Sequence, residues 1–429
     1  MAKLTARELV DTRLVIVGNL NGGLNALIHV DDSNARHQAD YHDQSQVERG
    51  PLFGTTFVAK DLIDVAHYRT RGGSRLFDNR QASHDAVCVA RLKAAGAIAL
   101  GKANMHEMAV GGAVNPWFGQ VVNPLSNSHG TGGTSSGSAA AVAAGLCDFS
   151  LGTDCGGSNR SVAAACGLYG YKPTNGLIAL DGVLPTAPTM DTVGIIAASP
   201  ELILGCLQAL TNEVTSSKEL ELKGRTFARI TNLVASPVDI AISNAIELAF
   251  ATIKSRGGQV VELRVQKPEE LAAAGVSILR YEFAQNYGEK IDKSAESVGP
   301  AVHSFLSASR QITKSQYDNA LAQRLECQAE WAAMLSGVDG FISPTAPGLA
   351  PDLDAEMTSV GSTRVSYGTA GAEFRMWANT IGIPAIAIPV RQHSGLPASV
   401  QLAGTAYCDG LLLNLAAALG QAMDEKIAA

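Results

Sequence analysis

The segment Gly152-Thr153-Asp154-Cys155-Gly156-Gly157-Ser158 places one serine hydroxyl directly after a run of small residues. Glycines let backbone N–H groups come close together, which is what an oxyanion hole requires. The small residues that follow, 160–167, predict a helix. Ser158 would then lie at a tight strand-to-helix turn, backed by a helix N-terminus and able to attack a carbonyl group. An ordinary glycine-rich turn with a solvated serine explains the same segment.

A lysine ends an apolar stretch earlier in the chain. Lys60 follows Thr55-Thr56-Phe57-Val58-Ala59, which has the composition of a buried strand. Burial disfavours the ammonium form and lowers the pKa of a lysine from about 10.4, so that a neutral amine can serve as a base. The alternative is a solvated charge at the end of a strand.

Between these two segments lies a second loop rich in glycine and hydroxyl groups, His129-Gly130-Thr131-Gly132-Gly133-Thr134-Ser135-Ser136-Gly137-Ser138. It opens an Ala-rich stretch that predicts a helix. The loop lacks the lysine of a P-loop and does not match the dinucleotide-binding glycine fingerprint, so phosphate binding is disfavoured. A Ser-rich cap with a purely structural role is the other interpretation.

Taken together in this order, Lys60-Asp61, Gly132–Ser138 and Gly152–Arg160 resemble the amidase signature family. The resemblance covers roughly residues 4 to 425 and is strongest between 50 and 195. Further blocks fit the same family: Asp61–Val65, Ala94–Ala97, Leu100–Met105, Gly167–Thr174, Asn379–Ala385 and Gly395–Leu402.

The resemblance implies a catalytic mechanism. Ser158 would be the nucleophile, a second serine would bridge it to a neutral Lys60, and backbone N–H groups of Cys155, Gly156, Gly157 and Ser158 would bind the oxyanion. Lysine and hydroxyl groups would carry the protons, so no cofactor and no metal is expected.

One departure concerns the bridging residue. The family places its bridging serine 24 positions before the nucleophile, and that position is Thr134 here. Threonine keeps the hydroxyl but adds a methyl group that restricts χ1. The register favours Thr134 as the bridge, Ser135 is the alternative, and an impaired enzyme is the third interpretation.

Several residues near the motifs bear on the substrate. Asn159 would satisfy backbone groups at the turn or line the pocket, whereas Cys155 is expected to be a small wall residue and not a thiol nucleophile. Asp154 and Arg160 would bind a substrate carboxylate or, more in keeping with burial, brace the loop as an ion pair. His129 is expected to hydrogen-bond within its loop. Pocket walls are expected from Met108–Phe118 (with Met108, Gly111 and Gly112), from Thr189–Val193 and from residues 270–380.

Alternating helical and extended patterns favour an α/β fold. The resemblance implies one α/β/α domain over residues 1–429, with a large mixed, twisted sheet covered by helices. Its core motifs occupy 50–195, a variable helical region 200–335, and closing strands and a helix 340–425. Val214–Lys223 is the most polar, loop-like interruption. Strands are expected at Leu24–Val30, Leu52–Lys60, Ala97–Gly101, Phe149–Gly152, Gln259–Val265, Gly340–Pro344, Ala385–Val390 and Ser399–Leu402, and helices at Asp85–Ala95, Ser138–Gly145, Ile240–Arg256, Glu269–Tyr287, Gln316–Leu335 and Gly410–Asp424.

Composition and net charge argue against several classes of binding partner. A net charge of −7 without a Lys/Arg-rich run argues against nucleic acid or an anionic membrane surface. No apolar run approaches the roughly 18 residues that span a bilayer. Seven scattered cysteines and an N-terminus without a secretory apolar segment indicate a cytoplasmic protein.

Three functions are therefore weighed. The first is an amidohydrolase acting on a small soluble amide or ureide, a homodimer by the resemblance. The second is the glutamine-hydrolysing component of a tRNA-dependent amidotransferase, for which the chain looks short. The third is a non-catalytic binding protein on the same fold.

Overall fold

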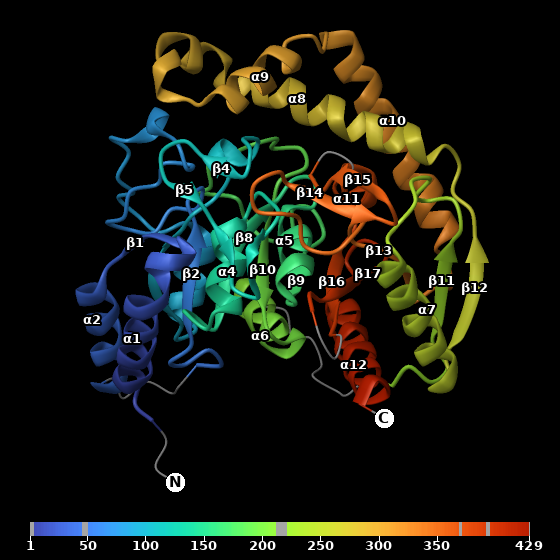
Figure 1. The fold of residues 1–429 in the computed structure, drawn as a ribbon, viewed down its shortest axis with the longest axis horizontal. Helices are drawn as coiled ribbons and strands as arrows, with labels where there is room; N and C mark the ends of the chain where they lie inside the picture. Colours follow the sequence, from blue (N-terminus) through green and yellow to red (C-terminus); the bar gives the residue numbers. More distant parts are fainter. Residues whose placement is uncertain (1–3, 45–49, 212–220, 369–370, 392–394, 429) are drawn as a thin grey trace.

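The structure is a computed structural model that describes residues 4–44, 50–211, 221–368, 371–391 and 395–428. Within these ranges, eleven strands form one sheet in the order β1-β3-β2-β8-β10-β9-β16-β17-β13-β11-β12 (Figure 1). The strands are β1 (Leu27–Val30), β2 (Thr56–Lys60), β3 (Ile98–Ala103), β8 (Phe149–Asp154), β9 (Tyr169–Lys172), β10 (Thr192–Ala197), β11 (Thr226–Ile230), β12 (Gln259–Leu263), β13 (Gly340–Pro344), β16 (Ala385–Val390) and β17 (Ala398–Ala403).

The sheet is mixed. Strand β2 is parallel to both β3 and β8, whereas β10 is antiparallel to β8 and to β9. Parallel pairing returns where β11 joins β12 and β13. The predicted fold class, a large mixed sheet covered by helices, is confirmed.

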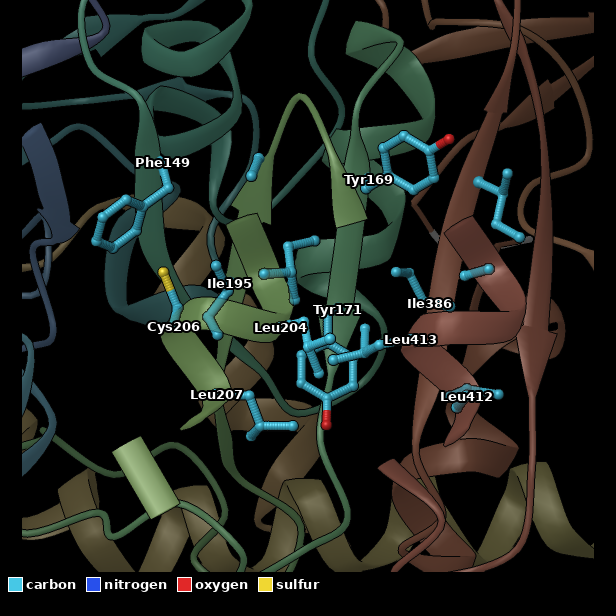
Figure 2. Close-up of a cluster of buried hydrophobic side chains, with 14 of the residues drawn as sticks. Phe149, Tyr169, Tyr171, Ile195, Leu204, Cys206, Leu207, Ile386, Leu412 and Leu413 are labelled. Carbon is cyan, nitrogen blue, oxygen red and sulfur yellow. The ribbon is translucent and has the colours of Figure 1, made fainter. Parts of the chain in front are cut away.

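Helices cover both faces of the sheet. One face packs against α3 (Val87–Ala94), α6 (Pro200–Thr211), α7 (Ile240–Ser255) and α12 (Asp409–Ala428). Figure 2 shows part of this core, where Phe149, Ile195 and Tyr171 of the sheet meet Leu207 of α6 and Leu412 of α12. The other face packs against α1 (Ala6–Leu24), α2 (Asp32–Gln44), α4 (Ser136–Ala143) and α5 (Ser158–Cys166).

A further group of helices lies across the top of the molecule in Figure 1, in yellow and orange. Trp331 of α10 and Trp377 of α11 stack with ring centroids 5.8 Å apart, and both belong to the core beneath β11 and β13. This group comprises α8 (Pro268–Lys293), α9 (Pro300–Ser309) and α10 (Lys314–Met334), and α11 (Gly371–Ile381) packs against α8 and α10 from below (Figure 1). The short elements are β4 (Val114–Asn115), β5 (Gly119–Gln120), β6 (Val122–Asn123), β7 (Ser126–Gly130), β14 (Met357–Val360), β15 (Thr363–Ser366) and the 3₁₀ turns Arg75–Phe77, Glu107–Ala109 and Ala295–Ser297.

Every predicted helix and strand named above overlaps an observed one, but several boundaries differ. The stretch Leu52–Thr55 is a turn before β2, and the helix expected after the nucleophile turn begins at Ser158 itself. Helices α1, α2, α6, α9 and α11 and strands β9, β10 and β11 were not predicted. Of the polar segment Val214–Lys223, residues 214–220 lie outside the described residues.

Helix α5 lies unusually close to the centre of the sheet. Glycines occupy the facing positions of three adjacent strands, Gly152 on β8, Gly194 on β10 and Gly170 on β9. A Cβ atom at Gly170 would lie 2.6 Å from the carbonyl oxygen of Asn159, and one at Gly194 would lie 2.2 Å from Asn159 Nδ2. Since real Cβ contacts are longer than this, only glycine allows α5 to lie where it does.

Among the described residues, none of the helices is both long and apolar enough to span a membrane.

Gly170→Ala tests this close approach. The added methyl group would meet the backbone of α5, and overpacking of this kind costs about 1–3 kcal/mol in the free energy of unfolding. Urea unfolding measures the change. Gly22→Ala is the matched control, because a Cβ at Gly22 meets no atom within 4 Å and alanine favours a helix such as α1 by about 0.5–1 kcal/mol. Equal stabilities for the two variants would contradict the expected crowding.

Candidate active site

Lys60 ends strand β2, which is buried along its whole length between β3 and β8. Its side chain is fully buried, and its Nζ lies 2.9 Å from Thr134 Oγ1 and 2.8 Å from Thr153 Oγ1. Burial lowers the pKa of Lys60 to about 7, although the carboxylates of Asp154 and Asp191 act in the opposite direction. The amine is therefore partly neutral near pH 7 and is held by two hydroxyl groups.

The loop before α4 brings Thr134 to this lysine. The peptide bond between Gly133 and Thr134 is cis, and the Thr134 carbonyl accepts the backbone N–H of His106 at 3.1 Å. A Cβ at Gly133 would lie 2.1 Å from the His106 ring, so this position also requires glycine. Ser135 points elsewhere, since its buried hydroxyl donates to Thr153 O at 3.2 Å and to Asn159 Oδ1 at 3.0 Å. Between the two candidates for the bridge, Thr134 is the one that contacts Lys60.

Ser158 is the first residue of α5 and is half-buried. Its hydroxyl donates to the carbonyl oxygen of Thr153, the residue whose own hydroxyl contacts Lys60. Lys60, Thr134 and Ser158 thus gather around Thr153, which sequence analysis did not single out. Thr153 therefore connects the Ser158 hydroxyl, through its carbonyl, to the partly neutral amine of Lys60, through its own hydroxyl.

A buried ion pair braces the turn that carries Ser158. Arg160 Nη2 lies 3.1 Å from Asp154 Oδ1, and neither side chain is exposed. Asp154 also accepts the backbone N–H groups of Gly157 at 2.8 Å and of Asn159 at 3.2 Å. Burial alone would raise the pKa of Asp154, but the Arg160 guanidinium outweighs it and holds this pKa well below its usual range.

These bonds change one expectation about the oxyanion hole. The N–H of Gly157 was expected to face the substrate, yet it is directed to Asp154 Oδ1. Asp154 and Arg160 are likewise committed to each other, which agrees with a bracing pair and not with a carboxylate-binding site. The remaining candidate donors are the N–H groups of Cys155, Gly156 and Ser158.

The amidase family model matches residues 8–413. The chain belongs to the amidase family. Its members hydrolyse amide C–N bonds, and this chain is an enzyme of that class.

Individual relatives agree over nearly the whole chain. The GatA-type component of the glutamyl-tRNA(Gln) amidotransferase of Methanothermobacter thermautotrophicus is 31% identical, with 96% of this chain and 94% of that protein covered. A crystal structure described as an amidase superposes with a TM-score of 0.91 at 29% identity, covering 97% of this chain and 96% of the other. A solved structure described as a vestigial protein complex that reveals the evolutionary origins of an s-triazine catabolic enzyme superposes with a TM-score of 0.90 at 27% identity, covering 99% of this chain and 95% of the other.

Other predicted residues lie around this amidase centre. Cys155 is buried with Met190 of the following loop, Ile278 of α8 and Met376 of α11. Burial raises the pKa of its thiol well above the usual value, so the thiol is neutral. Asn159 is fully buried between α5 and the sheet, which assigns it to packing rather than to a pocket wall.

The segment Met108–Phe118, expected to form a pocket wall, contains both buried and open positions. Met108 is buried against Phe283 and Tyr287, while the Gly111 N–H donates to the Glu107 carbonyl at 2.8 Å. Gly112 has open space around its α-carbon. His129 lies apart from Lys60 in the contacts it makes: its ring hydrogen-bonds Ser126 and Ser128, as expected of a loop residue.

Sequence analysis missed the long-range partners of the nucleophile turn. Asn379 Oδ1 accepts from Arg160 Nη2 at 2.7 Å, and Gln401 Oε1 accepts from Arg160 Nη1 at 3.0 Å. Both lie in C-terminal blocks that resemble the family, which was the only available signal. Their roles could not be read from local sequence, because each lies more than 200 residues from Arg160.

Asp154→Asn tests the bracing pair. The substitution leaves Arg160 charged and buried without a counter-ion, and breaking such a pair costs about 3–5 kcal/mol in unfolding free energy. Thermal and urea unfolding measure the loss. Glu247→Gln is the control, since the Arg229–Glu247 pair is exposed and its loss costs less than about 1 kcal/mol. Equal losses would show that burial gives the first pair no special weight.

Proposed function

We propose that this chain is a serine amidohydrolase that cleaves the C–N bond of a small soluble amide or ureide. The observation that carries the proposal is the buried Lys60, which has a pKa of about 7 and contacts both Thr134 and Thr153, the residue whose carbonyl accepts the Ser158 hydroxyl. A serine hydroxyl is a weak nucleophile until a base takes its proton. Lys60 supplies such a base without any histidine.

The proton would pass through Thr134. As Ser158 attacks the substrate carbonyl, it releases its hydrogen bond to Thr153 and gives its proton to Thr134 Oγ1, which gives its own to Lys60 Nζ. The oxyanion forms against the free N–H groups of the turn. The protonated Lys60 then returns the proton by the same path to the departing nitrogen, which leaves as ammonia or an amine. Water next attacks the acyl-serine by the reverse proton path and releases the acid.

Substitutions at Ser158 and Thr134 separate these roles. Ser158→Ala removes the nucleophile and is expected to abolish turnover, measured by ammonia release from a panel of small amides and ureides. Thr134→Ser keeps the relay hydroxyl and is expected to preserve most of the rate. Thr134→Val keeps the shape of the side chain but removes the hydroxyl, and is expected to lose most of the rate. General acid–base catalysis of this kind contributes roughly 10²–10⁴-fold.

Two outcomes would contradict this mechanism. The first is full activity of Ser158→Ala, and the second is an active Thr134→Val. Labelling of Ser158 with a fluorophosphonate is the control that does not require the right substrate, and its absence would favour a non-catalytic binding protein.

The rate should follow the ionisation of Lys60. Its pKa is lowered, so the active neutral form is lost as the pH falls through about 7. kcat/KM is expected to fall about tenfold per pH unit below that midpoint and to level off above it. His106 is the neighbouring titratable side chain, and burial lowers its pKa, so it titrates on the acidic side. Steady-state assays between pH 5 and 9 measure the profile, with Thr134→Ser as the control that keeps the midpoint. A flat profile would contradict Lys60 as the base.

A second candidate is the glutamine-hydrolysing component of a tRNA-dependent amidotransferase. The 31% identity to an archaeal amidotransferase component favours it. The expectation that the chain is short for this role is wrong, because it covers 94% of that relative. Ammonia release from free glutamine and association with partner proteins would support this function, whereas turnover of other amides by the isolated chain would support the first. Sedimentation of the isolated chain tests the expected homodimer.

A further inference from the structure

A second buried arginine lies against the nucleophile turn. Arg375 of α11 is 3% exposed, and a Cβ at Gly157 would lie 2.4 Å from Arg375 Cβ and 2.5 Å from Arg375 Nε. Its side chain therefore rests directly on the residue before Ser158. Gly156 and Ser158, on either side of Gly157, are each partly exposed, so the turn is open to a small ligand next to the residue that Arg375 contacts.

Arg375 lacks the counter-ion that Arg160 has. Its Nη1 donates to the carbonyl of Thr345 at 2.7 Å, while its Nε is buried without a hydrogen-bond partner. Among the described residues, none of the carboxylates lies within ion-pair distance of Arg375. The Tyr367 ring, 5.9 Å from the guanidinium carbon, offers only a weak cation–π contact.

The acidic groups of the neighbourhood are already engaged. Asp154 is paired with Arg160. Asp191 accepts the N–H groups of Thr186 and Ala187. Glu282 accepts the N–H of Thr189 and the Tyr317 hydroxyl. None of these three carboxylates, in the part of the chain that the structure describes, is therefore available to neutralise Arg375.

The charge at Arg375 persists in spite of burial. Burial lowers its pKa to about 10, and the Arg160 guanidinium acts in the same direction, but at neutral pH the side chain stays protonated. A buried cation with an open donor is costly to the protein until an anion binds to it.

We propose that Arg375 binds a carboxylate of the substrate, so that the enzyme acts on amides whose acyl part carries a carboxylate a few bonds from the scissile carbonyl. A planar guanidinium presents parallel N–H donors that match a carboxylate. Because Arg375 contacts the turn residue next to Ser158, the carboxylate and the attacked carbonyl belong to one short acyl chain. This inference rests on the proposed function of Ser158.

For a monoamide such as succinamate, the reaction consumes water and yields succinate and ammonium. The C–N bond breaks as the Ser158 ester forms, and the ester is then cleaved by water. The carboxylate bound to Arg375 takes no part in bond making.

Binding without chemistry is the first test. Calorimetry measures the affinity of malonate, succinate and glutarate, each with the neutral diamide of the same length as reference. The wild-type chain is expected to bind at least one dicarboxylate more tightly than its diamide. Arg375→Met is expected to lose roughly 10- to 100-fold of that affinity, as for a hydrogen bond to a charged group. Arg375→Lys keeps the charge without the planar fork and should lie between them, and Arg229→Met on the surface is the control.

Kinetics provide the second test. The wild type is expected to prefer succinamate over butyramide in kcat/KM, and Arg375→Met is expected to bring the ratio of the two kcat/KM values toward one, mainly through the loss on succinamate. Equal loss on both substrates would mark Arg375 as structural and overturn the inference. If Arg375→Met does not fold, the Arg375→Lys variant and the wild-type preference decide.

The two proposals fail in different ways. Absence of dicarboxylate binding by the wild type overturns the inference even if Ser158 hydrolyses neutral amides. Arg375-dependent dicarboxylate binding by a chain whose Ser158 is inert would support a carboxylate site at Arg375 and overturn the proposed function instead.

Discussion

The close approach of α5 to the central sheet is the constraint on which the rest of the site depends. Glycines on β8 and β10 leave room for the Asn159 side chain, and the glycine on β9 leaves room for the α5 backbone and Ala163. Because α5 begins at Ser158, its depth and tilt fix where that hydroxyl lies relative to β8. Thr153, near the end of β8, then contacts both the nucleophile and Lys60. The glycines that let α5 pack against the sheet therefore also set the position of Ser158.

The buried charged residues Asp154, Arg160 and Lys60 are of two kinds, those paired with an opposite charge and those held by hydroxyl groups. Asp154 and Arg160 neutralise each other at full burial, and Asp154 also binds backbone groups of the turn. Lys60 contacts hydroxyl groups in place of a carboxylate, and burial therefore moves its pKa toward neutrality. The contrast is physical: a paired charge stays charged and holds structure, whereas a lysine held by hydroxyl groups becomes a base that can take a proton.

The sequence predicted those parts of the site that depend on residues within a single short segment. The glycine turn before Ser158 and the apolar strand before Lys60 both lie as expected, and the register singled out Thr134, which contacts Lys60. Other features depend on residues far apart in the chain. The direction of the Gly157 N–H, the burial of Asn159 and the partners of Arg160 follow from how α5 meets β9, β10 and α11, which no local pattern encodes.

The fold shows the same division. Long amphipathic helices such as α7 and α10 were predicted because their periodicity extends over several turns. Strands β9 and β10 were missed since a central strand buried on both faces has no alternation to detect. Helix α2 is short and polar, with only Ala35 and Ala39 buried, so its sequence carries a weak signal.

Met376 of α11 fills the space between Gly156 of the nucleophile turn and Gly275 of α8. Lys60, Thr134 and Ser158 come from residues 60–158, whereas this covering layer is built from a later part of the chain. The two covering helices therefore differ in what a mutation in them reaches. A change in α8 alters side chains packed over the turn, whereas a change in α11 also reaches Asn379 and, through it, the ion pair that braces Ser158.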